Sequence, residues 1–218
     1  MSRGQRLLDL VAVMDRLRSP GGCPWDAEQT HESLVQYLVE ETYETVDAID
    51  AGDRDALIEE LGDLLLQVVF HARIGQEGEA AFDIDDVAGG IADKLVARHP
   101  HVFGDETAQT ADDVEAAWFE RKRREKGRSS VTDGVPAAMP ALPLIEKLLH
   151  RADKGGVLVP PVDPRVDALL DEHDAGELIL EIVAAARSRG LDADAAARRA
   201  AAGLRAELIR REGGSAQG

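Results

Sequence analysis

The chain has 218 residues, of which 44% are hydrophobic and only 4% aromatic, so its core must be built mainly from Leu, Val, Ile and Ala. These residues suit helices better than a disulfide-rich or low-complexity fold. With 25 basic against 42 acidic side chains, the formal net charge is −17. So acidic a surface argues against nucleic acid or an anionic membrane as the main partner.

Features tied to secretion are missing from the sequence. Cys23 is the single cysteine, which rules out an internal disulfide framework. No apolar run approaches the roughly 18 residues needed to cross a bilayer. The N-terminal stretch "MSRGQRLLDL" lacks the apolar core of a signal peptide. We therefore expect a cytoplasmic protein.

Hydrophobic spacing typical of helices runs through the first half of the chain. A loop is predicted at 19–26, Thr30 is a candidate helix N-cap, and 51–53 forms a turn. Asp83 or Asp85 can cap a helix that ends at Arg98, before Pro100. Helices are predicted at 6–18, 31–50, 54–76, from 82–86 to 98, and at 112–126.

Composition changes after residue 127. Residues 128–140 are rich in Gly, Ser and Pro and are predicted to be a linker between a first domain at 1–127 and a second at 141–213. No segment alternates as a strand would, so the predicted fold class is all-α, a helical bundle. Further helices are predicted at 141–154, 165–172, 175–189 and 193–212.

Two helices carry acidic faces without basic partners. Glu40, Glu41, Glu44 and Asp47 lie within about a third of the circumference of the first of these helices. The helix at 54–76 repeats the arrangement, and no basic residue occurs at 38–49 or 57–70. The acidic face of this helix consists of Glu59, Glu60 and Asp63, next to Gln67.

The simplest interpretation of each acidic face is the solvated side of an amphipathic helix. Solvated faces usually mix charges, however, because like charges four residues apart are destabilising. A short turn also joins the two helices, so they should be antiparallel neighbours whose acidic faces converge. Converging carboxylates with no Cys and no paired His favour Mg²⁺ or Mn²⁺ over zinc.

At these residues the chain resembles the MazG-type nucleoside triphosphate pyrophosphohydrolases, within the all-α NTP pyrophosphatase superfamily. The acids match the family's E-x-x-E…E-x-x-D pattern, in "EETYE" and "EELGDLL". Other segments that resemble the family, in family order, are "GCPWDAEQTH", "YLVEETYE", "EELGDLLLQVVFHARI" and "DKLVARHPHVFGD". The resemblance covers residues 5–125 closely.

The resemblance implies hydrolysis of the α–β bond of a nucleoside triphosphate, giving a monophosphate and pyrophosphate, for cleaning of the nucleotide pool. It implies Mg²⁺ held by Glu41, Glu44, Glu60 and Asp63. Metal ions would reconcile a polyanionic substrate with an acidic protein and activate the attacking water. A carboxylate outside the metal set must accept that water's proton. Glu59 and Glu40 are the candidates, and Glu59 is preferred.

Lys94 and Arg98 lie four residues apart in the stretch that resembles the family's "DKL…RHPHVF" segment. The resemblance suggests that they face the phosphates; the alternative is a surface basic pair. Trp25 either stacks on the nucleobase or closes a gap in helix packing. Both interpretations of Trp25 are open from the sequence.

The second half repeats the first in a degenerate form. "GDLLLQVVFHAR" from Gly62 aligns with "GELILEIVAAAR" from Gly176, and "FDIDDVAGGIADKLVAR" aligns with "LDADAAARRAAAGLRAE". Gly203 and Glu207 stand where Lys94 and Arg98 would be, and no E-x-x-E precedes them. The repeat is therefore predicted to be a scaffold without chemistry.

Two other classes of function are open. A di-iron carboxylate bundle needs two E-x-x-H motifs, whereas only Glu28-x-x-His31 matches. A non-catalytic binding or regulatory module would use the acidic helices as a docking surface. The family precedent is self-association, and two acidic helices leave apolar surface to cover, so we expect a homodimer.

Overall fold

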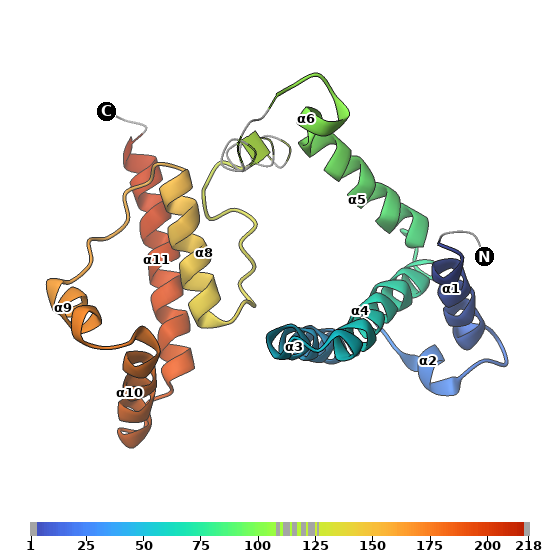
Figure 1. Cartoon of the computed structure of the whole chain (residues 1–218), viewed down its shortest axis with the longest axis horizontal. Coiled ribbons are helices and arrows are strands. Elements are labelled where there is room, and N and C mark those ends of the chain that lie inside the picture. Colours follow the sequence, from blue (N-terminus) through green and yellow to red (C-terminus); the bar gives the residue numbers. More distant parts are fainter. Residues whose placement is uncertain are drawn as a thin grey trace. The chain divides into compact units, whose positions relative to one another are not determined.

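The computed structural model describes residues 4–107, 110, 114, 117–118, 121, 125 and 127–215. Every regular element within these residues is a helix, which confirms the all-α prediction (Figure 1). Most of the helix predicted at 112–126 lies outside the described residues. None of the described helices is both long enough and apolar enough to span a bilayer. The chain divides into unit 1 (1–115) and unit 2 (116–218), which we describe separately.

Unit 1 is organised around one pair of long helices. Its helices are α1 (Gln5–Arg18), α2 (Pro24–Glu28), α3 (Val35–Ala51), α4 (Arg54–Gly75), α5 (Ile84–Arg98) and α6 (Pro100–Phe103). Helices α3 and α4 run side by side, and α1 packs on α4 (Figure 1). The core between them is built on the buried side chains of Met14, Leu34, Val69 and Phe70. Helix α4 therefore forms the centre of the unit.

Two predictions about the start of unit 1 are wrong in detail. The predicted loop at 19–26 contains the first residues of α2, which begins at Pro24 because proline suits the first position of a helix. Helix α3 begins at Val35 rather than at residue 31. Thr30 and Ser33 instead cap each other in a turn, with Ser33 N donating to Thr30 Oγ1 at 3.2 Å and Thr30 N to Ser33 Oγ at 2.9 Å.

The predicted boundaries of α5 are confirmed. The Asp83 side chain accepts hydrogen bonds from the backbone N–H groups of Asp85 and Asp86, and the Asp86 side chain accepts one from Asp83 N. This reciprocal capping box fixes the start of the helix. Helix α5 ends at Arg98, and Pro100 then begins α6, a short helix that was not predicted.

Unit 2 is built on a second helix pair. Its helices are α8 (Ala141–Lys154), α9 (Pro164–Glu172), α10 (Ala175–Ser188) and α11 (Ala193–Ser215). Helices α8 and α11 lie side by side (Figure 1). The core of the unit combines side chains from both of them with one from the preceding segment. Its buried members are Val135, Leu144, Leu148, Ala152, Ala201 and Leu208.

The segment predicted as a linker makes specific contacts within unit 2. Val135 is buried in the core, and its carbonyl accepts a hydrogen bond from Arg205 at 3.0 Å. Val131 N donates to the carboxylate of Glu212 on α11 at 2.7 Å. The Gly- and Ser-rich segment thus folds back on α8 and α11. The domain limits at 127 and 141 and the degenerate repeat stay predictions.

Candidate functional site

A tight turn between α3 and α4 brings the acidic residues together. Gly52 ends α3 in the left-handed conformation, with φ of 65°, which side chains other than glycine rarely adopt. Asp53 then caps α4, because its side chain accepts hydrogen bonds from the N–H groups of Asp55 and Ala56. Reversal within so few residues makes the two helices antiparallel neighbours.

Three of the four predicted metal ligands converge across this helix pair. Each of Glu41, Glu60 and Asp63 offers a carboxylate oxygen that lies within 4.8 Å of the others, and all three residues are half-buried. Glu44, the fourth predicted ligand, is exposed and lies close enough to interact electrostatically with both Glu41 and Glu60. The convergence expected from the sequence is present.

Mutual repulsion affects the protonation of two of these groups. Partial burial, followed by the charges of Asp63 and Glu44, raises the pKa of Glu41 above its usual range. Partial burial likewise raises the pKa of Glu60, together with the charges of Glu44 and Asp63. A positive charge at this point would remove the repulsion and lower both pKa values.

Basic side chains do not neutralise the cluster within the part of unit 1 that the structure describes. Only carboxylates appear among the charges that act on Glu41 and Glu60. Ion pairs of unit 1 form elsewhere, for example between Arg73 and Asp15 at 2.8 Å. Oxygen donors without sulfur or imidazole form the ligand set that Mg²⁺ and Mn²⁺ prefer. The residues present therefore fit a hard divalent cation.

The other predicted acids lie beside the cluster. Glu59 and Glu40 are both exposed, and each contributes repulsion to one member of the cluster, Glu59 to Glu60 and Glu40 to Glu41. Neither belongs to the group of three converging carboxylates. The preference for Glu59 over Glu40 as the proton acceptor stays a prediction.

The two predicted phosphate ligands lie on α5, which packs against α4 and α6. Lys94 is exposed, whereas Arg98 is buried, with 4% of its surface accessible. Neither residue is among the charges that act on Glu41 or Glu60. Their contact with phosphate stays a prediction.

Trp25 packs against two aromatic rings and is also half exposed, and its contact with a nucleobase stays a prediction. Its ring packs edge-on against Tyr37, with centroids 6.0 Å apart, and against Phe70, with centroids 6.4 Å apart. Half of its surface, 50%, remains accessible. Trp25 therefore fills a packing position and still presents an aromatic surface large enough for a flat ligand.

A pair of histidines, His31 and His71, was not predicted. The Nδ1 atoms of His31 and His71 lie 2.7 Å apart, and their rings stack within 5° of parallel. Burial, followed by the charge of His31, lowers the pKa of His71. Forty residues separate the two, so no local motif links them. Neither histidine belongs to the group of converging side chains found among the described residues, Glu41, Glu60 and Asp63.

Beyond Asp63, α4 carries two buried polar side-chain atoms that have no hydrogen-bond partner in the structure. Gln67 lies one turn after Asp63 and His71 one turn after Gln67. Gln67 Oε1 and His71 Nε2 are both buried without a hydrogen-bond partner in the structure. Gln67 lies next to the acidic face predicted for this helix, and no role was predicted for it.

Comparisons with known proteins agree with this geometry. Residues 29–103, which include α3, α4 and α5, match the model of the MazG nucleotide pyrophosphohydrolase domain. A nucleoside triphosphate pyrophosphohydrolase of Mycobacterium tuberculosis is 51% identical over 156 residues, which cover 71% of this chain and 47% of that protein. An uncharacterised 26.1 kDa protein of Streptomyces cacaoi is 54% identical over 200 residues, covering 91% and 79%.

A further relative covers most of both chains. The protein named nucleoside triphosphate pyrophosphohydrolase/pyrophosphatase MazG of Thermotoga maritima is 38% identical over 208 residues, which cover 88% of this chain and 80% of that protein. The matched domain contains all of the converging carboxylates. The chain therefore belongs to the MazG family of nucleotide pyrophosphohydrolases.

Proposed function

We propose that this chain hydrolyses nucleoside or deoxynucleoside triphosphates at the α–β bond, releasing a monophosphate and pyrophosphate, and that it serves to clean the nucleotide pool. The observation that carries the proposal is the convergence of Glu41, Glu60 and Asp63 within 4.8 Å, with no basic partner in the described part of unit 1. Family membership gives the reaction class.

Glu41, Glu44, Glu60 and Asp63 are the proposed ligands for Mg²⁺, or for Mn²⁺ in its place. When bound, the cation would neutralise charge on the phosphates and lower the pKa of the attacking water. The raised pKa values of Glu41 and Glu60 mean that the cluster binds a positive charge more readily than isolated carboxylates would. The same carboxylates without a cation would repel the substrate.

The remaining roles are assigned by position and charge. Glu59 is adjacent to Glu60 but outside the converging group, so it is free to accept a proton from water. Lys94 and Arg98 are proposed to bind phosphate oxygens, and the half-exposed ring of Trp25 is proposed to contact the nucleobase. A cytoplasmic location fits a nucleotide substrate.

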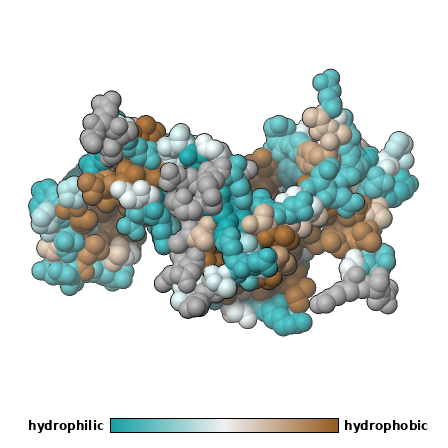
Figure 2. Space-filling model, turned by 90° about the horizontal axis from the view of Figure 1, so that it is seen from above, coloured by the Kyte–Doolittle hydropathy of each residue, from teal (hydrophilic) through white to brown (hydrophobic). Residues whose placement is uncertain are grey.

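A homodimer is proposed on the basis of the apolar surface that unit 1 leaves exposed. Figure 2 shows apolar residues in brown on the face drawn. The exposed large apolar side chains of α3, α4 and α5 include Val35, Val39, Val46, Ile49, Ile58, Leu61, Ile91 and Leu95. Exposed apolar patches on helices often mark surfaces that bind another protein chain. The commonest such assembly is a homodimer with two-fold symmetry. Light scattering of the full chain should give the mass of a dimer.

The reaction is tested by incubating the protein with a panel of canonical and modified triphosphates and Mg²⁺, and by separating the products. We expect monophosphate and pyrophosphate in equal amounts, and no turnover when EDTA removes the metal. Diphosphate with inorganic phosphate would place the cleavage at the other bond. Absence of metal-dependent turnover with every triphosphate would instead favour a non-catalytic binding or regulatory module.

A further inference from the structure

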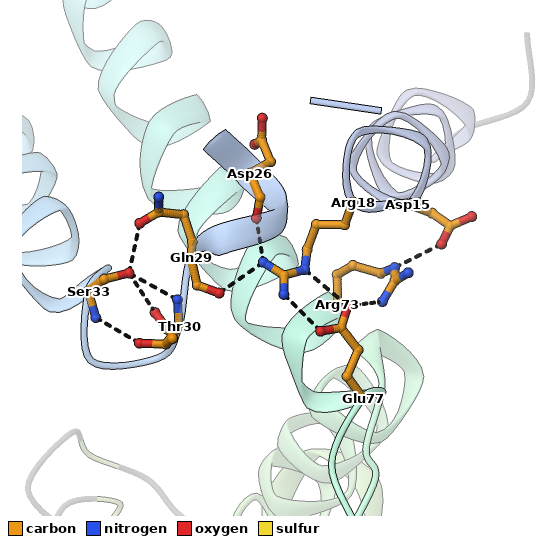
Figure 3. A network of polar contacts seen from close by, with 8 residues as sticks. All are labelled: Asp15, Arg18, Asp26, Gln29, Thr30, Ser33, Arg73 and Glu77. Carbon is orange, nitrogen blue, oxygen red and sulfur yellow. Dashed lines mark hydrogen bonds and ion pairs between the residues drawn. The ribbon is translucent and has the colours of Figure 1, made fainter. Parts of the chain in front are cut away.

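One arginine joins α1, α2 and the end of α4. Arg18 is the last residue of α1, and 5% of its side chain is accessible. Its Nε and Nη2 atoms bind the two carboxylate oxygens of Glu77 at 3.1 and 2.8 Å. On the other side, Nη1 donates to the carbonyls of Asp26 and, at 3.0 Å, Gln29 (Figure 3). The planar guanidinium thus links a carboxylate to two backbone carbonyls.

The two carbonyls belong to the C-terminal end of α2. Carbonyls in the last turn of a helix have no partner within the helix and attract cations. Gln29 extends the connection, because its Nε2 donates to the carbonyl of Trp25 at 3.0 Å. Its Oε1 accepts from Ser33 Oγ at 2.7 Å (Figure 3). The position of α2 is therefore set from outside the helix.

A helix of five residues, Pro24–Glu28, is too short to be stable alone. The buried Arg18 charge would be costly without its partners, so the contact with α2 is a specific one. Arg18 also lies over the Phe70 ring, 5.8 Å from its centroid, and Phe70 is one of the two rings on which Trp25 packs. Arg18 and Trp25 therefore share a neighbour, and loss of the Arg18 contacts would release the helix that carries Trp25.

We propose that Arg18 is a positioning residue that holds Trp25 in the orientation in which its exposed surface receives the nucleobase. The inference rests on the proposed nucleobase contact of Trp25. Arg18 itself touches no substrate in this proposal: it acts through α2. The Glu77 carboxylate, whose pKa is lowered mainly by its hydrogen bonds with Arg18, keeps the guanidinium in place.

Arg73 provides a matched control. It binds the same Glu77 carboxylate, with Nη1 to Oε1 at 2.8 Å, and it also binds Asp15 at 2.8 Å, but its bonds do not reach α2. Lysine keeps the charge at either position but cannot form the fork. Arg18→Lys and Arg73→Lys therefore each disturb the Glu77 network, and only Arg18→Lys removes the bonds to α2.

The first measurement needs no substrate. The chain has two tryptophans, Trp25 and Trp118, so a Trp118→Phe background leaves Trp25 as the sole fluorophore. Quenching of Trp25 by acrylamide should increase in Arg18→Lys and stay unchanged in Arg73→Lys, with circular dichroism showing both variants folded. If Arg18→Lys does not fold, Glu77→Gln, which weakens the fork but keeps the arginine, takes its place. Unchanged quenching would overturn the proposal.

The second measurement is kinetic, with Mg²⁺ and a triphosphate that the unmodified protein turns over. Arg18→Lys should raise KM by about tenfold, the size of one base–aromatic contact, with kcat little changed. Combining Arg18→Lys with Trp25→Ala should add nothing to the effect of Trp25→Ala alone. A rise in KM that persists in the Trp25→Ala background, or increased quenching without any change in KM, would overturn the positioning role.

The two measurements separate this proposal from the proposed function. If the unmodified protein turned over no triphosphate, the reaction and the nucleobase contact would fail together, whatever the quenching showed. If it did turn over a triphosphate but Trp25→Ala left KM unchanged, the nucleobase contact alone would fail and Arg18 would have nothing to position.

Discussion

The antiparallel pair α3–α4 of unit 1 and the parallel pair α8–α11 of unit 2 arrange their charges in opposite ways. In unit 2, between α8 and α11, buried Arg151 donates to the carbonyls of Val131 and Asp133, and Arg205 donates to Val135. Glu207 is paired with Arg210 and Arg211. In unit 1, between α3 and α4, the carboxylates of Glu41, Glu60 and Asp63 face one another.

The charged groups of unit 2 form contacts that stabilise the fold, whereas the carboxylates of unit 1 form a candidate ligand site. Buried Arg151 donates hydrogen bonds to two backbone carbonyls and thereby stabilises the segment that contains them. Carboxylates that raise each other's pKa oppose folding to a small extent, so their retention points to binding. Side-by-side helices thus form a scaffold in one unit and a candidate site in the other.

The largest effect is expected from removing a carboxylate of the α3–α4 pair. Glu41→Gln, Glu60→Gln and Asp63→Asn should each lower turnover by at least about 100-fold, because each removes charge from the proposed cation site. The melting temperature without metal should stay the same or rise, since repulsion is relieved. Pyrophosphate release and circular dichroism melts with and without Mg²⁺ provide the measurements.

The control for these variants is Asp50→Asn, an exposed carboxylate on α3 outside the converging group. It should retain normal turnover. Near-normal turnover in any two of the three site variants would mean that the cluster does not hold the catalytic metal, and the contrast between the two helix pairs would lose its functional meaning.

A medium effect, confined to stability, is expected in unit 2. Arg151→Met should destabilise the protein by about 3 kcal/mol, because it leaves the partly buried carbonyls of Val131 and Asp133 without the arginine donor. Turnover per folded molecule should be unchanged. Arg165→Met removes an exposed ion pair with Asp163 and should cost less than about 1 kcal/mol. Denaturant titration compares the two, and equal losses would contradict the structural role of Arg151.

The smallest effect is a pH dependence within unit 1. Burial lowers the pKa of His71 in the folded state, so below about pH 6.5 the unfolded chain takes up a proton more readily than the folded one. The stability that this histidine contributes is complete above that pH and is lost as the pH falls. Melting temperatures between pH 7.5 and 5.5 should therefore fall less in His71→Phe than in the unmodified protein.

Exposed His173 serves as the control for this titration, and His173→Gln should follow the unmodified protein across the whole range. An identical pH profile for His71→Phe would show that the His31–His71 contact does not titrate in the folded protein.

Local patterns predicted the parts of this structure that depend on local physics. Helical spacing and the capping residue Asp83 gave the all-α class and the start of α5. The acidic spacing gave the convergence of Glu41, Glu60 and Asp63, because a short turn leaves two long helices little choice but to pair. The family assignment made from the same motifs is confirmed by the comparisons.

Features that depend on distant contacts were not predictable. The helix α2 is held by Arg18, and the His31–His71 pair joins positions forty residues apart. The Gly- and Ser-rich segment at 128–140 folds onto α8 and α11 because Arg151 and Arg205 bind its carbonyls, which composition cannot indicate. The exact ligand set, the phosphate contacts of Lys94 and Arg98 and the role of Trp25 stay predictions.

Because of the tight turn at Gly52, the candidate site depends on the number of residues between the turn and each carboxylate. Glu41 and Asp63 each lie eleven residues from Gly52, and Glu44 and Glu60 each lie eight residues from it. Two residues that are equally far in sequence from a tight turn lie opposite each other in the two antiparallel helices that the turn joins. One residue inserted within α3 or α4 between the turn and the acids would rotate the carboxylates beyond it by about 100° while leaving all four present. Between Glu41 and Asp63, insertions and deletions are therefore as damaging as substitutions, whereas longer loops elsewhere in unit 1 would leave the carboxylates in register.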